Sequence, residues 1–194
     1  LTDLGRNAAP RNVAADIGKL FGEAIAKKID TDLTALFDGF STEVGDITSA
    51  MTAARLFEAM VNLRTSAVPM DSIACVLHPS VAYDLKANLT NTFANSNAND
   101  LANQALRDGF VGRIAGVNVF ETTNVGNTGN IGDHKNAVFH KDALGLAMMQ
   151  DLKIETQRDA SLRADEIVAT SVYGVGELHD TYGVEVAADS SIIN

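Results

Sequence analysis

The feature that most constrains this chain is a long stretch near its start in which apolar residues recur at helical spacing. Pro10 precedes the stretch and Gly39 follows it, which suits the start and the stop of one helix over residues 12–38. At about 1.5 Å per residue the helix would be roughly 40 Å long. Because the stripe lacks sustained heptads with charged flanks, we expect it to lie along a flat domain and not in a coiled coil. The stripe consists of Val13, Ile17, Leu20, Phe21, Ala24, Ile25, Ile29, Leu33, Leu36 and Phe37.

The rest of the chain predicts an α+β fold, with helices early and strands late. Thr48 is expected to cap a second helix that ends before Pro69, after a link over residues 41–46. The apolar run Ile73–Leu77 predicts a strand buried on both faces, and residues 80–89 predict a third helix. Asn-rich residues 91–99 and Gly-rich residues 124–134 predict exposed loops, the second of them mobile, and residues 101–107 predict a short helix. Further strands are expected at residues 110–114, 117–120, 137–139, 146–149, 152–157, 167–173 and 183–186, of which the last closes the sheet.

Length and charge narrow the function classes. The 194 residues suit one domain or two small lobes, and the formal charge of −10 opposes nucleic-acid binding, which needs clustered Lys and Arg. The acidity either keeps the protein soluble or repels an enclosed DNA polymer. The absence of a long apolar run and of a secretory signal predicts a soluble, unexported protein with no membrane partner. The single cysteine, Cys75, is expected to be a buried thiol in a strand.

No pattern in the sequence predicts catalysis. The four histidines, His78, His134, His140 and His179, lack metal-ligand spacing to one another or to Cys and Glu. No serine lies in a G-x-S-x-G turn, and the glycines of residues 124–134 lack the Lys-Ser/Thr of a phosphate-binding loop. We therefore expect no enzyme and no catalytic, cofactor-binding or metal-binding residue.

One polar patch predicts contacts instead of chemistry. Its charges alternate in sign, which is typical of ion pairs within or between subunits and not of a paired-acid active site. The patch consists of Arg158, Asp159, Arg163, Asp165 and Glu166.

The order of these features resembles the major capsid proteins of tailed phages, which have the Hong Kong 97-type fold. The resemblance depends on a strand that leads into His78-Pro79-Ser80 and a helix, and on Gly109-Phe110-Val111-Gly112-Arg113-Ile114-Ala115-Gly116-Val117-Asn118-Val119. Residues 137–143, 155–159, 167 and 172–174 are similar to the closing part of such coats, especially those of short-tailed and marine phages.

The resemblance implies a long spine helix, a peripheral domain and an axial domain. The peripheral domain would comprise residues 1–66 and 150–181, and the axial domain residues 67–149 and 182–194. Residues 124–134 would then be an axial loop, which adds Asn127, Asn130 and His134 to the polar patch as candidate intersubunit contacts. In the family an N-terminal arm and an extended loop precede the spine helix; about ten residues precede it here, so we expect this chain to lack both.

The function implied is a subunit that assembles with copies of itself, in pentamers and hexamers, into an icosahedral shell of the virion. The shell would form in the host cytoplasm and enclose phage DNA without specific binding, with scaffolding, portal or decoration proteins as further partners. The alternatives are an encapsulin-like shell, a monomeric α+β enzyme or ligand-binding domain, and a ring-forming portal or tail adaptor.

Overall fold

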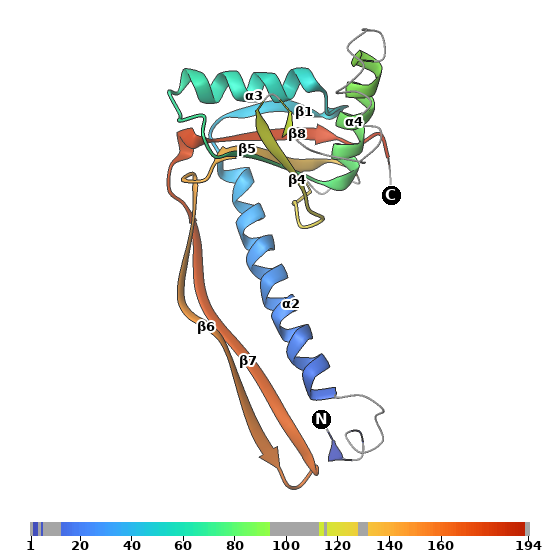
Figure 1. The fold of residues 1–194 in the computed structure, drawn as a ribbon, viewed down its shortest axis with the longest axis vertical. Coiled ribbons are helices and arrows are strands. Elements are labelled where there is room, and N and C mark those ends of the chain that lie inside the picture. The colour runs from blue at the N-terminus through green and yellow to red at the C-terminus, as the bar shows by residue number, and fades with distance from the viewer. Residues whose placement is uncertain are drawn as a thin grey trace. The chain divides into compact units, whose positions relative to one another are not determined.

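The computed structural model describes residues 2–3, 5, 13–93, 113–114, 116–127 and 132–192, and it divides the chain into two compact units. Unit 1 comprises Leu1–Asp30 and Leu146–Val175. Unit 2 comprises Thr31–Gly145 and Gly176–Asn194. Figure 1 shows the elements of both.

Unit 2 is built on a mixed sheet, which within the described residues has six strands in the order β1-β8-β5-β2-β4-β3. Parallel pairing joins β1 to β8 and β2 to β4, whereas β5 is antiparallel to both β2 and β8. The last strand of the sequence therefore lies inside the sheet and does not close it at an edge. The strands are β1 (Glu43–Ala50), β2 (Ile73–Leu77), β3 (Arg113–Ile114), β4 (Val117–Glu121), β5 (His134–His140) and β8 (Gly183–Asp189).

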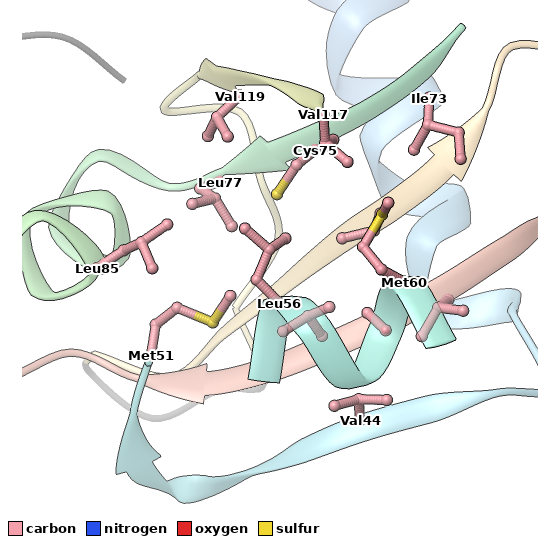
Figure 2. Packing of buried hydrophobic residues seen from close by; sticks show 14 of the residues in the cluster. Val44, Met51, Leu56, Met60, Ile73, Cys75, Leu77, Leu85, Val117 and Val119 are labelled. Atoms are coloured by element: carbon pink, nitrogen blue, oxygen red, sulfur yellow. The ribbon is translucent and has the colours of Figure 1, made fainter. Parts of the chain in front are cut away.

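Two helices of unit 2 enclose the main core: α3 (Ala53–Thr65) and α4 (Pro79–Phe93). Leu56 and Leu63 of α3 and Leu77 of β2 are all fully buried in one hydrophobic cluster. Figure 2 shows α3 packing its apolar side against the strands. Cys75 lies in the same cluster, which confirms the predicted buried thiol, and burial raises the pKa of this thiol to about 12.

A smaller cluster covers the other face of the sheet. Phe37 of the 3₁₀ helix η1 (Ala35–Gly39) and Phe40 pack with Ala137 and Val76. Because neighbouring strand residues point to opposite faces, Cys75 and Val76 of β2 contribute to different clusters. The prediction of a strand at Ile73–Leu77 that is covered on both faces is confirmed. A second 3₁₀ helix, η2 (Asp180–Tyr182), precedes β8.

Unit 1 contains most of the long helix α2 (Val13–Thr34) and of a two-stranded sheet formed by β6 (Leu144–Asp159) and β7 (Ala164–Glu177). The long helix is confirmed, with its last predicted turn tightened into η1. The strand runs expected at residues 146–149 and 152–157 are one continuous strand of 16 residues. The polar patch lies at the end of this hairpin and does not interrupt the strands.

The second helix was predicted too early. It begins at Ala53, where the hydroxyl of Thr52 accepts a hydrogen bond from the Arg55 N–H, and residues 43–50, expected as a link and a helix start, form β1. Asp46 explains the difference, because its carboxylate accepts hydrogen bonds from the N–H and hydroxyl of Thr48. Thr48 is therefore held in the extended segment and caps no helix.

Some of the other predicted elements are confirmed, and others have different boundaries in the structure. α4 continues to Phe93, so residues 91–93 are helical and not part of the expected loop, and His134 begins β5 and does not end a loop. The turn between β3 and β4 and the strand at residues 137–139 are confirmed. The expected loop at 94–99, the helix at 101–107 and Asn130 lie outside the described residues. Residues 31–66 group with the sheet in unit 2, and the expected peripheral and axial domains stay a prediction.

Candidate assembly surfaces

The hairpin of β6 and β7 exposes apolar side chains along its length. None of the residues in either strand is buried. Because side chains alternate across a strand, Leu146, Met148, Leu152 and Ile154 share one face of β6, and each is between 36% and 47% exposed. Met149, on the opposite face, is 89% exposed. Within the described residues, β6 and β7 pair with each other and, at Ala164, with Thr2. A two-stranded hairpin is marginal alone in water, which makes this surface a candidate for contact with another chain.

The long helix of unit 1 is similarly uncovered. Its apolar stripe, including Ile17, Phe21, Ile25 and Ile29, is only half-buried, and no described side chain between Val13 and Leu33 is fully buried. Leu20 is 62% exposed. A helix gains most of its stability by burying such a stripe, so the stripe is a second apolar surface without full cover in one chain.

The hairpin tip carries the predicted polar patch, in which Arg158 forms ion pairs within the chain. The Arg158 guanidinium donates to both carboxylate oxygens of Asp3, at 2.7 and 2.6 Å, and to Asp165 at 3.2 Å. These carboxylates raise the pKa of Arg158. The backbone N–H of Asp3 also donates to the Arg163 carbonyl oxygen, and Thr2 forms a bridge with Ala164. The N-terminal segment is thus tied to the tip.

Asp159 shapes the turn between the two strands. Its carboxylate accepts hydrogen bonds from the N–H groups of Ser161 and Leu162 and from the Ser161 hydroxyl, which lower its pKa. Arg163 takes a left-handed backbone conformation with φ of 47°. Leu162 is consequently held at the tip, where it is 71% exposed.

The structure brings together only part of the predicted contact set. Arg158, Asp159, Arg163, Asp165 and Glu166 lie at or beside the hairpin tip in unit 1. Asn127 and His134 belong to unit 2, where they form an isolated β-bridge. Asn127 is exposed, whereas His134 is half-buried against His78. Whether any of these residues touches a second copy stays a prediction.

A polar depression in unit 2 was not foreseen. It has a volume of about 560 Å³ and is lined by Asp38, Glu43, Asn127, Lys135 and Glu185, among others. Lys135 forms ion pairs with Asp38 and, at 3.6 Å, with Glu185. Glu185 is 5% exposed, and burial raises its pKa against the attraction of Lys135. The sequence carried no signal for this group, since Glu43, Lys135 and Glu185 come together only through the pairing of β1, β8 and β5.

The described residues offer no obvious place for a metal. No group of three or more His, Cys, Asp or Glu side chains that could hold an ion occurs among them. Within the same residues, no helix combines the length and apolar character needed to cross a membrane.

Comparison with known proteins identifies the fold. No protein-family model matches the sequence, and no curated protein matches it. Solved structures do match: a structure from Mycobacterium phage Che8 has a TM-score of 0.80 at 21% identity, over 96% of this chain and 67% of that one. The capsid of cyanophage P-SCSP1u has a TM-score of 0.79 at 19% identity, over 98% of this chain and 70% of that one.

An encapsulin complex also matches, at a lower TM-score. The holo-SrpI encapsulin complex of Synechococcus elongatus has a TM-score of 0.69 at 11% identity, over 100% of this chain and 73% of that one. The chain therefore has the Hong Kong 97-type fold of phage major capsid proteins, as its sequence motifs implied. Within this fold, the early helix and the late hairpin both expose apolar side chains, among them Leu20 and Met149.

Proposed function

We propose that this chain is the greater part of a phage major capsid protein, a structural subunit that associates with copies of itself to build the shell of the virion. The observation that carries the proposal is the β6–β7 hairpin, whose strands of 16 and 14 residues bury no side chain within the chain. A surface of this kind gains stability only when another chain covers it, because the hydrophobic effect scales with the apolar area removed from water.

In this proposal the fold serves to repeat the same contacts between neighbouring subunits. In a closed shell each subunit repeats the same contacts many times, so interfaces that are weak individually add up. The apolar face of the hairpin would supply the free energy of association, and the charged tip would set the register between neighbours, since exposed ion pairs give specificity more than affinity. Pentamers and hexamers are the arrangement we propose, assembled in the host cytoplasm, with scaffolding, portal or decoration proteins as further partners.

The acidic net charge of the chain supports a shell that encloses DNA without binding it. With 25 acidic and 15 basic residues, the chain lacks the excess of cations that holds DNA. A structural role without catalysis is consistent with the phage capsid and encapsulin structures that share its fold.

Size-exclusion chromatography with light scattering, followed by electron microscopy, tests the proposal. The expressed chain, at or above the concentration where subunits associate, is expected to give megadalton particles or multimeric capsomers. A stable 20.5 kDa monomer at all concentrations would contradict it, and open rings instead of closed particles would favour a portal or adaptor.

A matched pair of variants tests the hairpin directly. Leu152→Glu places a charge on the apolar face of β6 and is expected to abolish particle formation while the melting temperature of the free subunit stays unchanged. Met149→Glu, on the opposite face of the same strand, is the control and is expected to assemble. Equal assembly by both variants would exclude the apolar face as the interface.

The encapsulin-like shell is the second candidate, because the Synechococcus structure matches the whole chain. Both candidates predict particles, so assembly does not separate them. The contents do: particles purified from the native source would hold DNA if the chain is a phage coat, and protein cargo if it is an encapsulin-like shell.

A further inference from the structure

A stacked pair of histidines lies at one end of the sheet of unit 2. The rings of His78 and His134 have centroids 3.7 Å apart and planes inclined by only 13°. His78 lies between β2 and α4, and His134 is the first residue of β5. The pair therefore joins the start of α4 to the start of β5, and it belongs to none of the exposed surfaces described above.

His78 has a hydrogen-bond arrangement that suits a neutral ring. Its Nδ1 accepts from the backbone N–H of Ser80 at 3.4 Å and lies 2.7 Å from the Ser80 hydroxyl. The neutral tautomer that fits carries its proton on Nε2, so a second proton would have to occupy Nδ1. There it would remove the acceptor for Ser80 and place positive charge at the N-terminus of α4, where the helix dipole opposes it.

His134 also disfavours a second proton. Its Nδ1 is buried and has no hydrogen-bond partner among the residues that the structure describes. A protonated imidazole is a donor at both nitrogens, and a buried donor without an acceptor is destabilising. Two charged rings in this stack would in addition repel each other. Geometry thus gives both rings the same preference for the neutral form.

The surrounding charges oppose this preference without reversing it. Asp133, next to His134, and Asp189 of β8 favour a charged His134, as does the Gly126 carbonyl, but burial and His78 outweigh them and lower the pKa of His134. Burial lowers the pKa of His78 as well. Two other charged groups on α4 and β5 have partners of their own: Asp84 accepts hydrogen bonds from Ser191, and Lys135 forms ion pairs with Asp38 and Glu185.

We propose that the His78–His134 stack is a proton-sensitive contact that fastens α4 to β5 in the neutral state and loosens this end of unit 2 on acidification. The direction of the pH effect follows from the pKa of the two rings, which is lower in the folded chain than the ordinary imidazole value of 6.5. A histidine of this kind contributes stability to the folded chain above pH 6.5, and this stability is lost as the pH falls below that value. Mild acid would therefore change the subunit at this point before its exposed carboxylates are protonated.

Melting temperature against pH tests the inference. Between pH 7.5 and 5.5 the unaltered chain is expected to lose several degrees more than His134→Phe, which keeps a flat ring in the stack but cannot bind a proton. His179→Gln alters an exposed histidine outside the pair and is the control, expected to follow the unaltered chain. The same loss in His134→Phe as in the unaltered chain would overturn the proposal.

A measurement on the unaltered chain covers the case in which His134→Phe fails to fold. Hydrogen–deuterium exchange at the imidazole Cε1, followed by mass spectrometry, reports the pKa of each histidine in a particle of any size. His78 and His134 are expected to titrate below 6.5, the ordinary value. Titration of both rings at or above that value would overturn the inference, and the proposed shell function would be unaffected.

Discussion

The sheet of unit 2 buries apolar side chains in clusters on both of its faces, whereas the hairpin strands of unit 1 bury none of theirs. Leu77 of β2 is fully buried, and Leu152 of β6 is 36% exposed. Both are leucines in strands, so the difference lies in what covers them and not in their chemistry. Unit 2 has a buried core within one chain, whereas the described hairpin strands bury no residue, and we propose that another copy covers them.

The largest expected contrast comes from truncating these two leucines. Leu77→Ala removes fully buried methyl groups and leaves a cavity, which should lower the free energy of unfolding by about 3–5 kcal/mol. Leu152→Ala should cost the free subunit less than about 1 kcal/mol, because the site is already partly in water. Urea denaturation of the unassembled chain measures both, and equal losses would break the comparison.

Two glycines give the next largest effect within unit 2. Gly45 of β1 has φ of 92°, and a Cβ there would overlap the Ala187 carbonyl oxygen and approach the Arg55 Nη1 atom at 2.9 Å. Gly116 has φ of 88° but open space around its Cα. Gly45→Ala is therefore expected to cost about 2–3 kcal/mol, and Gly116→Ala about 1 kcal/mol from backbone strain alone.

Besides the overlap with the Ala187 carbonyl oxygen, a Cβ at Gly45 would disturb the hydrogen bonds of Arg55. Arg55 of α3 donates to the carbonyl oxygens of Asp46, Ser49 and Ala187 and pairs with the Asp46 carboxylate at 2.9 Å. Similar melting temperatures for the two glycine variants would show that this network yields without cost.

A smaller effect is expected at the buried carboxylate of unit 2. Burial raises the pKa of Glu185, so ionisation of this carboxyl group destabilises the folded chain. The destabilisation is absent below the ordinary pKa of 4.5 and grows as the pH rises through the folded pKa. Glu185→Gln should therefore be at least as stable as the unaltered chain at pH 7 and lose this advantage near pH 4. Melting curves at both values check the sign, and a variant less stable at pH 7 would show that the Lys135 pair dominates.

The smallest effect on the free subunit is expected at the hairpin tip. Arg158→Ala removes ion pairs to Asp3 and Asp165 that are open to water, so screening leaves them little weight in folding. The urea midpoint should stay within measurement error, while particles should form more slowly or with more irregular shapes. A marked loss of subunit stability would mean that the tip is a folding element and not a contact.

Local patterns in the sequence predicted the elements that depend on their own residues. The stripe from Val13 to Phe37 predicted α2, and the apolar run at Ile73–Leu77 predicted β2, because periodicity and burial are written in consecutive residues. β1 was missed because its partner is β8, with Val44 opposite Val186, and the residues of β1 alone read as a polar link.

The candidate surfaces were predicted in part for the same reason. The alternating charges from Arg158 to Glu166 indicated ion pairs, and Arg158 does pair with Asp165. The partner Asp3 was not foreseen, since 155 residues separate it from Arg158. The apolar face of β6 was not predicted as one surface, because Gln150 and Asp151 divide the apolar sequence into two segments. The strand continues through both residues.

Amide hydrogen exchange of residues 144–177, compared between free subunits and assembled particles, tests most directly whether the hairpin relies on other copies. Exchange in the free subunit should be fast along β6 and β7 and slow in β2, β5 and β8, and assembly should slow the hairpin by a hundredfold or more, on the order of 3 kcal/mol of added protection. Equal exchange of the hairpin in both states would contradict the account.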